Sequence, residues 1–192
     1  MTRSTRLGLA ALLLLPALAA CSPAPASPDS ACVLIGEELV GQLVPGHERA
    51  VTTRMPGDSY NSVTCTVKGS ATGPRTAELT ATLERHGSCA GADDGSTVCN
   101  PPREMANRAY DPTCATWRAN PETRGVEVTV PGVGRRACAF ALTGPDRRLV
   151  TVHLLSQVDG DLVIVTYAAG PSTPELAVPA AAAVANNIWA AL

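Results

Sequence analysis

The chain has 192 residues and a formal charge of −2 at pH 7, with 45% hydrophobic and 3% aromatic residues. This length is enough for one domain with a sizeable core. The weakly acidic balance argues against nucleic acid as a partner, and so few aromatic side chains argue against platforms that stack on sugars or bases.

The first predicted element is a signal peptide over residues 1–20. Arg3 and Arg6 form its basic region, and the apolar run that follows, residues 7–20, is too short to span a bilayer as a helix. The sequence Leu18-Ala19-Ala20-Cys21 resembles the lipobox of bacterial lipoproteins, which implies cleavage before Cys21 and acylation of that residue. We therefore expect a lipid anchor on the extracytoplasmic face of the cell membrane. An ordinary cleavage site with an incidental cysteine is the alternative.

Residues 21–31 are expected to be the lipidated cysteine and a flexible tether, because they are rich in Pro, Ser and Ala and lack apolar periodicity. Residues 32–192 then form a single extracytoplasmic domain. Without residues 1–20 the chain has 13 basic and 17 acidic residues, a formal charge of −4. This balance argues against an anionic membrane face as a partner.

The first half of the domain predicts a helix and two strands. Ile35, Leu39 and Leu43 recur at helical spacing, and Pro45-Gly46 ends that helix. Residues 46–61 are expected to be a loop. Alternating apolar residues then predict strands over residues 63–67 and 77–83.

Residues 87–121 are expected to be an insertion in the domain, since they lack regular alternation. Asn100-Pro101-Pro102 predicts the start of a helix. Asp111-Pro112 predicts its end, followed by a second turn through Cys114 and Trp117.

The last part of the chain predicts further strands and a helix. Strands are expected at residues 126–130 and 137–142, and a hairpin at 149–155 and 162–167, with its turn at Asp159-Gly160. A C-terminal helix starts at Thr173-Pro174-Glu175, with a kink or restart expected at Pro179. The pattern predicts an α+β fold, with an antiparallel sheet of about five to six strands covered by N- and C-terminal helices.

Six cysteines remain in the domain after Cys21 is assigned to lipid, and in an exported domain they indicate three disulfides with fifteen possible pairings. Cys89 and Cys99 flank a Gly-rich loop, and a bridge between them would close a short hairpin. Zinc bound by His86, Cys89 and Cys99 is the alternative, but the sequence has no C-x-x-C pair.

The best enzyme-like motif is Gly132-Val133-Gly134-Arg135-Arg136-Ala137, which has the G-x-G-x-x-A spacing of dinucleotide-binding loops. Such a loop needs a helix after it, so that helix N–H groups meet the phosphate. Residues 137–142 alternate as a strand instead. We therefore interpret the motif as a turn between strands and expect no cofactor.

The other candidate catalytic, metal-binding or anion-binding residues do not form a recognised motif. His86 lies near Ser88, but there is no G-x-S-x-G motif, and His153 is expected on the outer face of a strand. Residues 93–96, Asp-Asp-Gly-Ser, lack the further carboxylates of a calcium loop, so no metal is expected. Arg135-Arg136 and Arg147-Arg148 indicate either a solvated face or a site for anions or phospholipid head groups.

Several short motifs together resemble a known family. They are the lipobox, the tether, C-x-L-x-x-x-E-L from Cys32, Cys65-Thr66, and VPGVG-x-x-A at residues 130–137. The chain is similar over residues 32–192 to uncharacterised actinobacterial lipoproteins related to the LpqN-type lipoproteins. The resemblance implies a PsbP-like α/β/α sandwich and no established catalytic residues. Thr66 departs from the family, in which a Trp often follows that cysteine, and the extracellular sensor domains of kinases from the same bacteria are a neighbouring possibility.

The resemblance implies a disulfide between Cys32 and Cys65, which leaves Cys114 with Cys138 by elimination. It also leads us to expect a lipid-anchored, non-catalytic domain. Such a domain would bind a small apolar or lipid ligand, or a cell-envelope protein, between sheet and helices. The alternatives are a cell-envelope hydrolase or transferase with an unrecognised site, and a purely sensory or structural interaction module.

Overall fold

The computed structural model describes residues 30–56, 60–70, 76–91 and 97–192. For Pro56 and for residues 88–91 and 97–100 it describes the backbone only.

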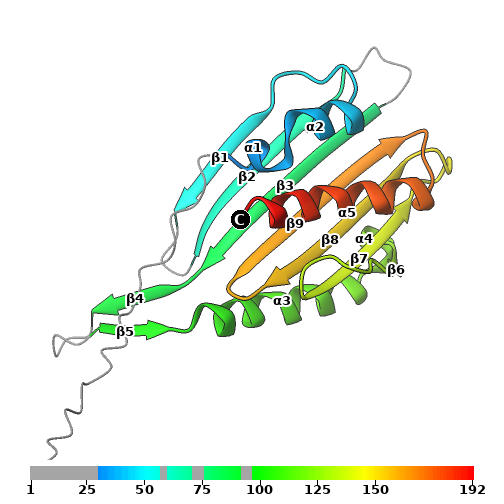
Figure 1. Cartoon of the computed structure of the whole chain (residues 1–192). Coiled ribbons are helices and arrows are strands. Elements are labelled where there is room, and N and C mark those ends of the chain that lie inside the picture. The colour runs from blue at the N-terminus through cyan, green and yellow to red at the C-terminus, as the bar shows by residue number, and fades with distance from the viewer. Residues whose placement is uncertain (1–29, 57–59, 71–75, 92–96) are drawn as a thin grey trace, which may run out of the picture.

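Within these residues, seven strands form one antiparallel sheet in the order β1-β2-β3-β9-β8-β7-β6 (Figure 1). The strands are β1 (Val51–Pro56), β2 (Tyr60–Lys68), β3 (Thr76–His86), β6 (Val126–Val128), β7 (Arg136–Thr143), β8 (Val150–Val158) and β9 (Asp161–Gly170). A separate hairpin of β4 (Ser88–Gly91) and β5 (Thr97–Asn100) extends from the end of β3 (Figure 1). The predicted antiparallel α+β fold is confirmed, but the sheet has more strands than expected.

The additional strand is β1, which lies in the segment that we expected to be a loop. Each of residues 51–55 is exposed, so the strand has no alternation of buried and exposed positions from which to recognise it. It pairs with β2 alone, from Val51 opposite Thr66 to Pro56 opposite Asn61. An edge strand of this kind is held mainly by its backbone ladder rather than by a buried face.

Three helices cover one face of the sheet: α1 (Ala31–Ile35), α2 (Glu37–Leu43) and α5 (Pro174–Ala190) (Figure 1). The single N-terminal helix that we expected is two helices, because Gly36 has a φ of +87° that an α-helix does not allow. The C-terminal helix α5 continues through Pro179, so it does not restart there. Buried Ala177 and Ala181 flank Pro179 and hold this part of α5 on the sheet.

The other face is covered in part by α3 (Pro102–Arg118) and the short α4 (Pro121–Arg124), both from the region around the predicted insertion. Tyr110, Cys114 and Trp117 pack from α3 against Phe140, Leu155 and Leu162 of the sheet. The expected end of this helix at Pro112 is wrong. Proline removes one helical hydrogen bond, but the packing of the turns on both sides of it keeps the helix continuous.

Two disulfides join helices to strands. Cys32 of α1 is bonded to Cys65 of β2, and Cys114 of α3 to Cys138 of β7. With a sequence separation of 24 residues between its cysteines, the second disulfide stabilises the fold by about 3 kcal/mol, chiefly by restricting the unfolded chain. The β4–β5 register places the backbone of Cys89 opposite that of Cys99. Their side chains lie outside the described residues, so this bridge stays a prediction.

The glycine motif forms the turn that leads into β7. Gly132 and Gly134 have φ values of +74° and +61°, and β7 begins two residues after Gly134. The Arg135 backbone N–H donates to the Gln157 carbonyl oxygen over 2.8 Å. A strand, rather than the helix that a phosphate site requires, therefore follows the loop.

We predict that Gly134→Ala destabilises the fold more than Gly132→Ala. Both substitutions place a side chain at positive φ, which costs about 1–2 kcal/mol. A Cβ at Gly134 would also lie 2.9 Å from the Gln157 carbonyl oxygen, whereas a Cβ at Gly132 would meet nothing within 4 Å. Urea unfolding of the two variants measures the difference. Equal free energies of unfolding would show that the close approach to β8 contributes nothing.

Candidate functional site

A cleft of about 200 Å³ lies between the sheet and two helices. The end of α2, the start of β3, the end of β9 and the start of α5 form its walls. Its lining residues are Gln42, Leu43, Pro45, Thr76, Ala77, Tyr167, Ala169, Gly170, Pro171, Ser172, Leu176 and Ala180. We call it the α2–α5 cleft. Leu176 lines it and is 68% exposed, so the cleft has an apolar residue at its surface.

Several polar groups around the α2–α5 cleft already have partners within the protein. The Tyr167 hydroxyl donates to the Leu43 carbonyl oxygen over 3.1 Å, which joins β9 to the end of α2. The Gln42 amide donates to the Glu38 carboxylate, and the Ser172 hydroxyl donates to the Thr173 carbonyl oxygen. A bound polar group would have to compete with these bonds. These bonds reduce the number of polar groups in the cleft that are free to bind a polar ligand.

The opposite side of α5 has a second, shallower groove, of about 350 Å³. The turn before the glycine motif forms one wall and α5 the other. Its residues are Thr129, Val130, Pro131, Val178, Pro179, Ala182, Ala183 and Asn186. The glycine motif thus borders a surface groove of small and apolar side chains, and no sheet strand forms its floor.

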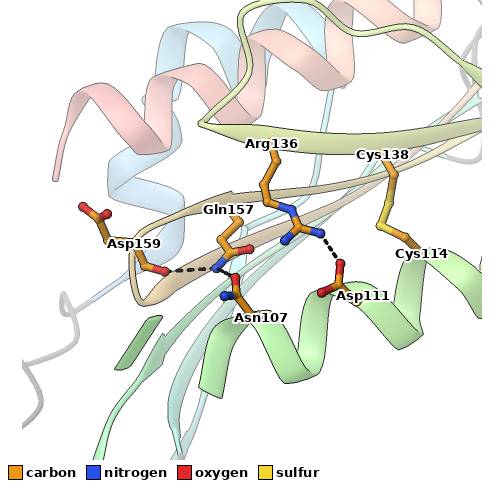
Figure 2. Close-up of polar contacts among 7 residues, drawn as sticks. All are labelled: Asn107, Asp111, Cys114, Arg136, Cys138, Gln157 and Asp159. Carbon is orange, nitrogen blue, oxygen red and sulfur yellow. Dashed lines mark hydrogen bonds and ion pairs between the residues drawn. A yellow bond between two sulfur atoms is a disulfide. The ribbon is translucent and has the colours of Figure 1, made fainter. Parts of the chain in front are cut away.

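A polar cluster joins α3 to the sheet on the face away from α5 (Figure 2). The Gln157 amide on β8 donates to the Asn107 Oδ1 of α3 over 2.9 Å and to the Asp159 carbonyl oxygen over 3.0 Å. Arg136 on β7 reaches Asp111 of α3, and its guanidinium lies 3.9 Å from the centre of the Tyr110 ring. Burial raises the pKa of Tyr110, while the bond and charge of Arg136 oppose that rise. These contacts lie one and two helical turns before the Cys114–Cys138 disulfide.

The Gln157 Oε1 is the one buried side-chain polar atom without a hydrogen-bond partner among the described residues. Gln157 itself is 3% exposed, so this oxygen lies inside the α3–sheet contact rather than in a surface cleft. The Gln157 backbone also accepts from Arg135 in the glycine turn. Gln157 therefore links the glycine turn, the β8–β9 hairpin and α3 through hydrogen bonds.

His153 of β8 lies under α3 and α4. Its Nδ1 is 3.2 Å from Arg124 Nη1 and 3.3 Å from Thr166 Oγ1, and the ring lies 5.9 Å from that of Trp117. Since the guanidinium can only donate, Nδ1 accepts and the neutral ring carries its proton on Nε2. Burial, and secondarily the Arg124 charge, lower the pKa of His153 from 6.5 to about 4. His153 is on the face opposite α5, as the alternation predicts, but it is 8% exposed rather than open to solvent.

The other predicted candidates do not meet in one site. His86 is buried, with its Nε2 3.3 Å from Glu84 Oε2 and its ring beside Tyr60. The Ser88 side chain and residues 93–96 lie outside the described residues, as does Cys21. No group of three or more metal-ligating side chains gathers in the described part of the chain.

The two arginine pairs differ in their surroundings. Arg135 forms an ion pair with Asp159 and Arg136 with Asp111, so the first pair binds carboxylates of the protein itself. Arg147 and Arg148 are in the turn between β7 and β8, where the Arg148 backbone N–H donates to Asp146. No pattern in the sequence indicates the α2–α5 cleft or the role of Gln157, because their contacts join distant elements.

Comparison of the chain with models of protein families, with curated proteins and with solved structures finds no match. Among the described residues, no helix is both long and apolar enough to cross a membrane.

We predict that His153 makes the fold acid-sensitive between pH 6.5 and 4. Its pKa is lower in the folded than in the unfolded chain, so in this window the unfolded chain binds more protons. The free energy of unfolding should therefore fall as pH falls from 6.5 through 4. His153→Gln keeps an acceptor for Arg124. It should make the free energy of unfolding depend less steeply on pH, by up to the contribution of one bound proton. Urea unfolding across this range tests the effect, and an unchanged slope in the variant would contradict it.

Proposed function

We propose that the chain is a lipid-anchored, extracytoplasmic, non-catalytic domain that binds an apolar group in the α2–α5 cleft. The lipobox-like sequence at Cys21 supports the anchor, and the resemblance to LpqN-type lipoproteins supports a PsbP-like sandwich. The observation that carries the binding proposal is the cleft itself. It lies between sheet and helices, where Tyr167, Gln42 and Ser172 have polar bonds within the protein.

The volume of the cleft limits the size of the ligand that it can enclose. Pockets that enclose drug-sized ligands measure roughly 300–1,000 Å³. At about 200 Å³ the α2–α5 cleft is smaller. It fits the end of an acyl chain rather than a whole lipid, with the rest of the ligand outside. We therefore propose a cell-envelope lipid as the ligand class.

Filling the cleft should weaken binding of the apolar ligand. Ala180→Phe places a ring in the cleft, because Ala180 is one of its walls. Ala183→Phe is the matched control, since Ala183 lies on the same helix but lines the groove on the other side of α5. We expect native mass spectrometry to show an apolar adduct on the wild-type and Ala183→Phe proteins. Occupancy in Ala180→Phe should be at least about tenfold lower, which corresponds to about 1.4 kcal/mol.

Two results would contradict ligand binding in the α2–α5 cleft. An adduct of equal occupancy in both variants would place the ligand elsewhere. A wild-type protein without any adduct, but cross-linked in cells to one specific protein, would favour the purely sensory or structural module. Near-native melting temperatures of both variants are the control for folding.

The anchor has its own test. Cys21→Ser removes the thiol that a lipobox presents for acylation. We expect the variant to leave the membrane fraction, since two or three acyl chains provide stable anchoring and the substitution removes them. Fractionation of expressing cells, with a second lipoprotein as marker, measures this. Retention of Cys21→Ser in the membrane would refute the lipid anchor.

A further inference from the structure

The outer face of α5 is uncharged. Residues 176–190 of this helix contain no charged side chain, although 17% of the residues in the chain are charged. The helix lies over the sheet as an outer layer (Figure 1), where Pro179 and Asn186 are exposed and Ala182 and Ala183 partly exposed. A surface helix normally has charged or polar residues opposite its buried face. The composition of this face is therefore closer to that of a contact surface.

The groove beside this face has a second uncharged wall. The turn that leads into β7, residues 128–134, also contains no charged residue. Val130 and Pro131 of the turn form one wall of the groove of about 350 Å³, and Val178, Pro179 and Ala182 belong to the other. We call it the α5–turn groove. Apolar and small side chains thus line both of its walls.

The charged residues at the borders of these two segments already have partners within the protein. The pairs are Glu127 with Arg118, Arg135 with Asp159, and Glu175 with Thr173. No side chain that lines the α5–turn groove is charged. The groove therefore offers apolar contact rather than recognition of a charged ligand.

The surface consists of a ridge beside a groove. Pro179, Ala183 and Asn186 follow one another at spacings of three and four residues, so they form a ridge along α5. The α5–turn groove runs along one side of this ridge. When two such surfaces meet about a two-fold axis, the ridge of each can enter the groove of the other. The small side chains of Ala182 and Ala183 allow two helices to approach closely at that point.

The size of the surface reaches the lower limit for a specific interface. The 17 residues of α5 make it about 25 Å long. A helix with its side chains is about 10 Å wide, so the ridge and a groove that receives its copy cover about 20 Å by 25 Å. This corresponds to about 500 Å² on each copy. The total of about 1,000 Å² is what a specific protein–protein interface needs.

We propose that two copies of the chain associate through this surface, with their α5 helices antiparallel and the two-fold axis beside Ala182 and Ala183. Pro179 of one copy then lies opposite Asn186 of the other. Self-association brings no like charges together, because the surface is uncharged, whereas a different protein is commonly selected through complementary charge. The α2–α5 cleft is on the other side of α5 and stays open. The association requires neither the lipid anchor nor a ligand in the cleft.

The test is disulfide cross-linking of the full chain in expressing cells, read on non-reducing gels after mild oxidation. Ala183→Cys places a thiol beside the proposed axis. Leu176→Cys is the matched control on the same helix, since Leu176 is 68% exposed. It lies about 10 Å from the axis along α5, so the two copies of this residue are about 20 Å apart, too far for a disulfide. We expect at least fivefold more covalent dimer with Ala183→Cys, after subtraction of the wild-type background.

A second pair of variants tests the contact itself. Ala182→Glu, added to Ala183→Cys, places two carboxylates close together at the axis, which disfavours association. We expect the fraction of covalent dimer to fall at least fivefold. Ala182→Gln is the neutral control of similar shape and should lower the fraction less. Near-native melting temperatures of the purified variants are the control for folding.

The outcomes separate this proposal from the proposed function. Equal cross-linking of Ala183→Cys and Leu176→Cys would overturn the antiparallel contact, because random collision does not favour the less exposed position. A mixed disulfide of Ala183→Cys with another protein, without the covalent dimer, would also overturn it and assign the groove to a different partner. A wild-type protein without an apolar adduct, but with the Ala183→Cys cross-link, would refute the ligand and leave the dimer standing.

Discussion

The fold depends on the burial of β8 on both of its faces. Residues 152–157 are all buried, alternately toward α5 and toward α3. A strand in this position needs a helical layer on each side. The first layer comes from the two ends of the domain, and the second from α3, far away in sequence. A disulfide and the Gln157–Asn107 bond hold α3 against the sheet. Among the described residues, the β1–β2 side has no such second layer, and residues 51–55 of its outer strand are exposed.

Elements with a buried face were predictable from sequence, and elements without one were not. The β8–β9 hairpin follows from alternating apolar residues and from Asp159-Gly160, and the structure has that turn. Residues 51–55 of β1 are all exposed, so no buried position among them marks the strand. Pro112 misleads because a local rule for helix ends is overridden by tertiary packing of the residues around it. The α2–α5 cleft was invisible for a related reason: four separate elements form it, and its position depends on the final strand order.

The polar residues that look most reactive in the sequence serve the fold where the structure describes them. His153 bonds to Arg124 and Thr166 across the α4–sheet contact, and His86 lies between Glu84 and Tyr60. Arg135 and Arg136 bind carboxylates on the hairpin turn and on α3. The spacing of these residues in the sequence reflects their positions in and beside the sheet. This is why the proposed function is built on an apolar cleft and not on these side chains.

The α2 wall of the cleft is held to the sheet at two points. The Tyr167 hydroxyl donates to the Leu43 carbonyl oxygen, and the Glu48 backbone N–H donates to the Lys68 carbonyl oxygen, which fixes the segment after Pro45 to the end of β2. Under the proposed function an acyl chain end enters this cleft while the rest of the lipid stays outside it, which fits a cleft too small for a whole lipid.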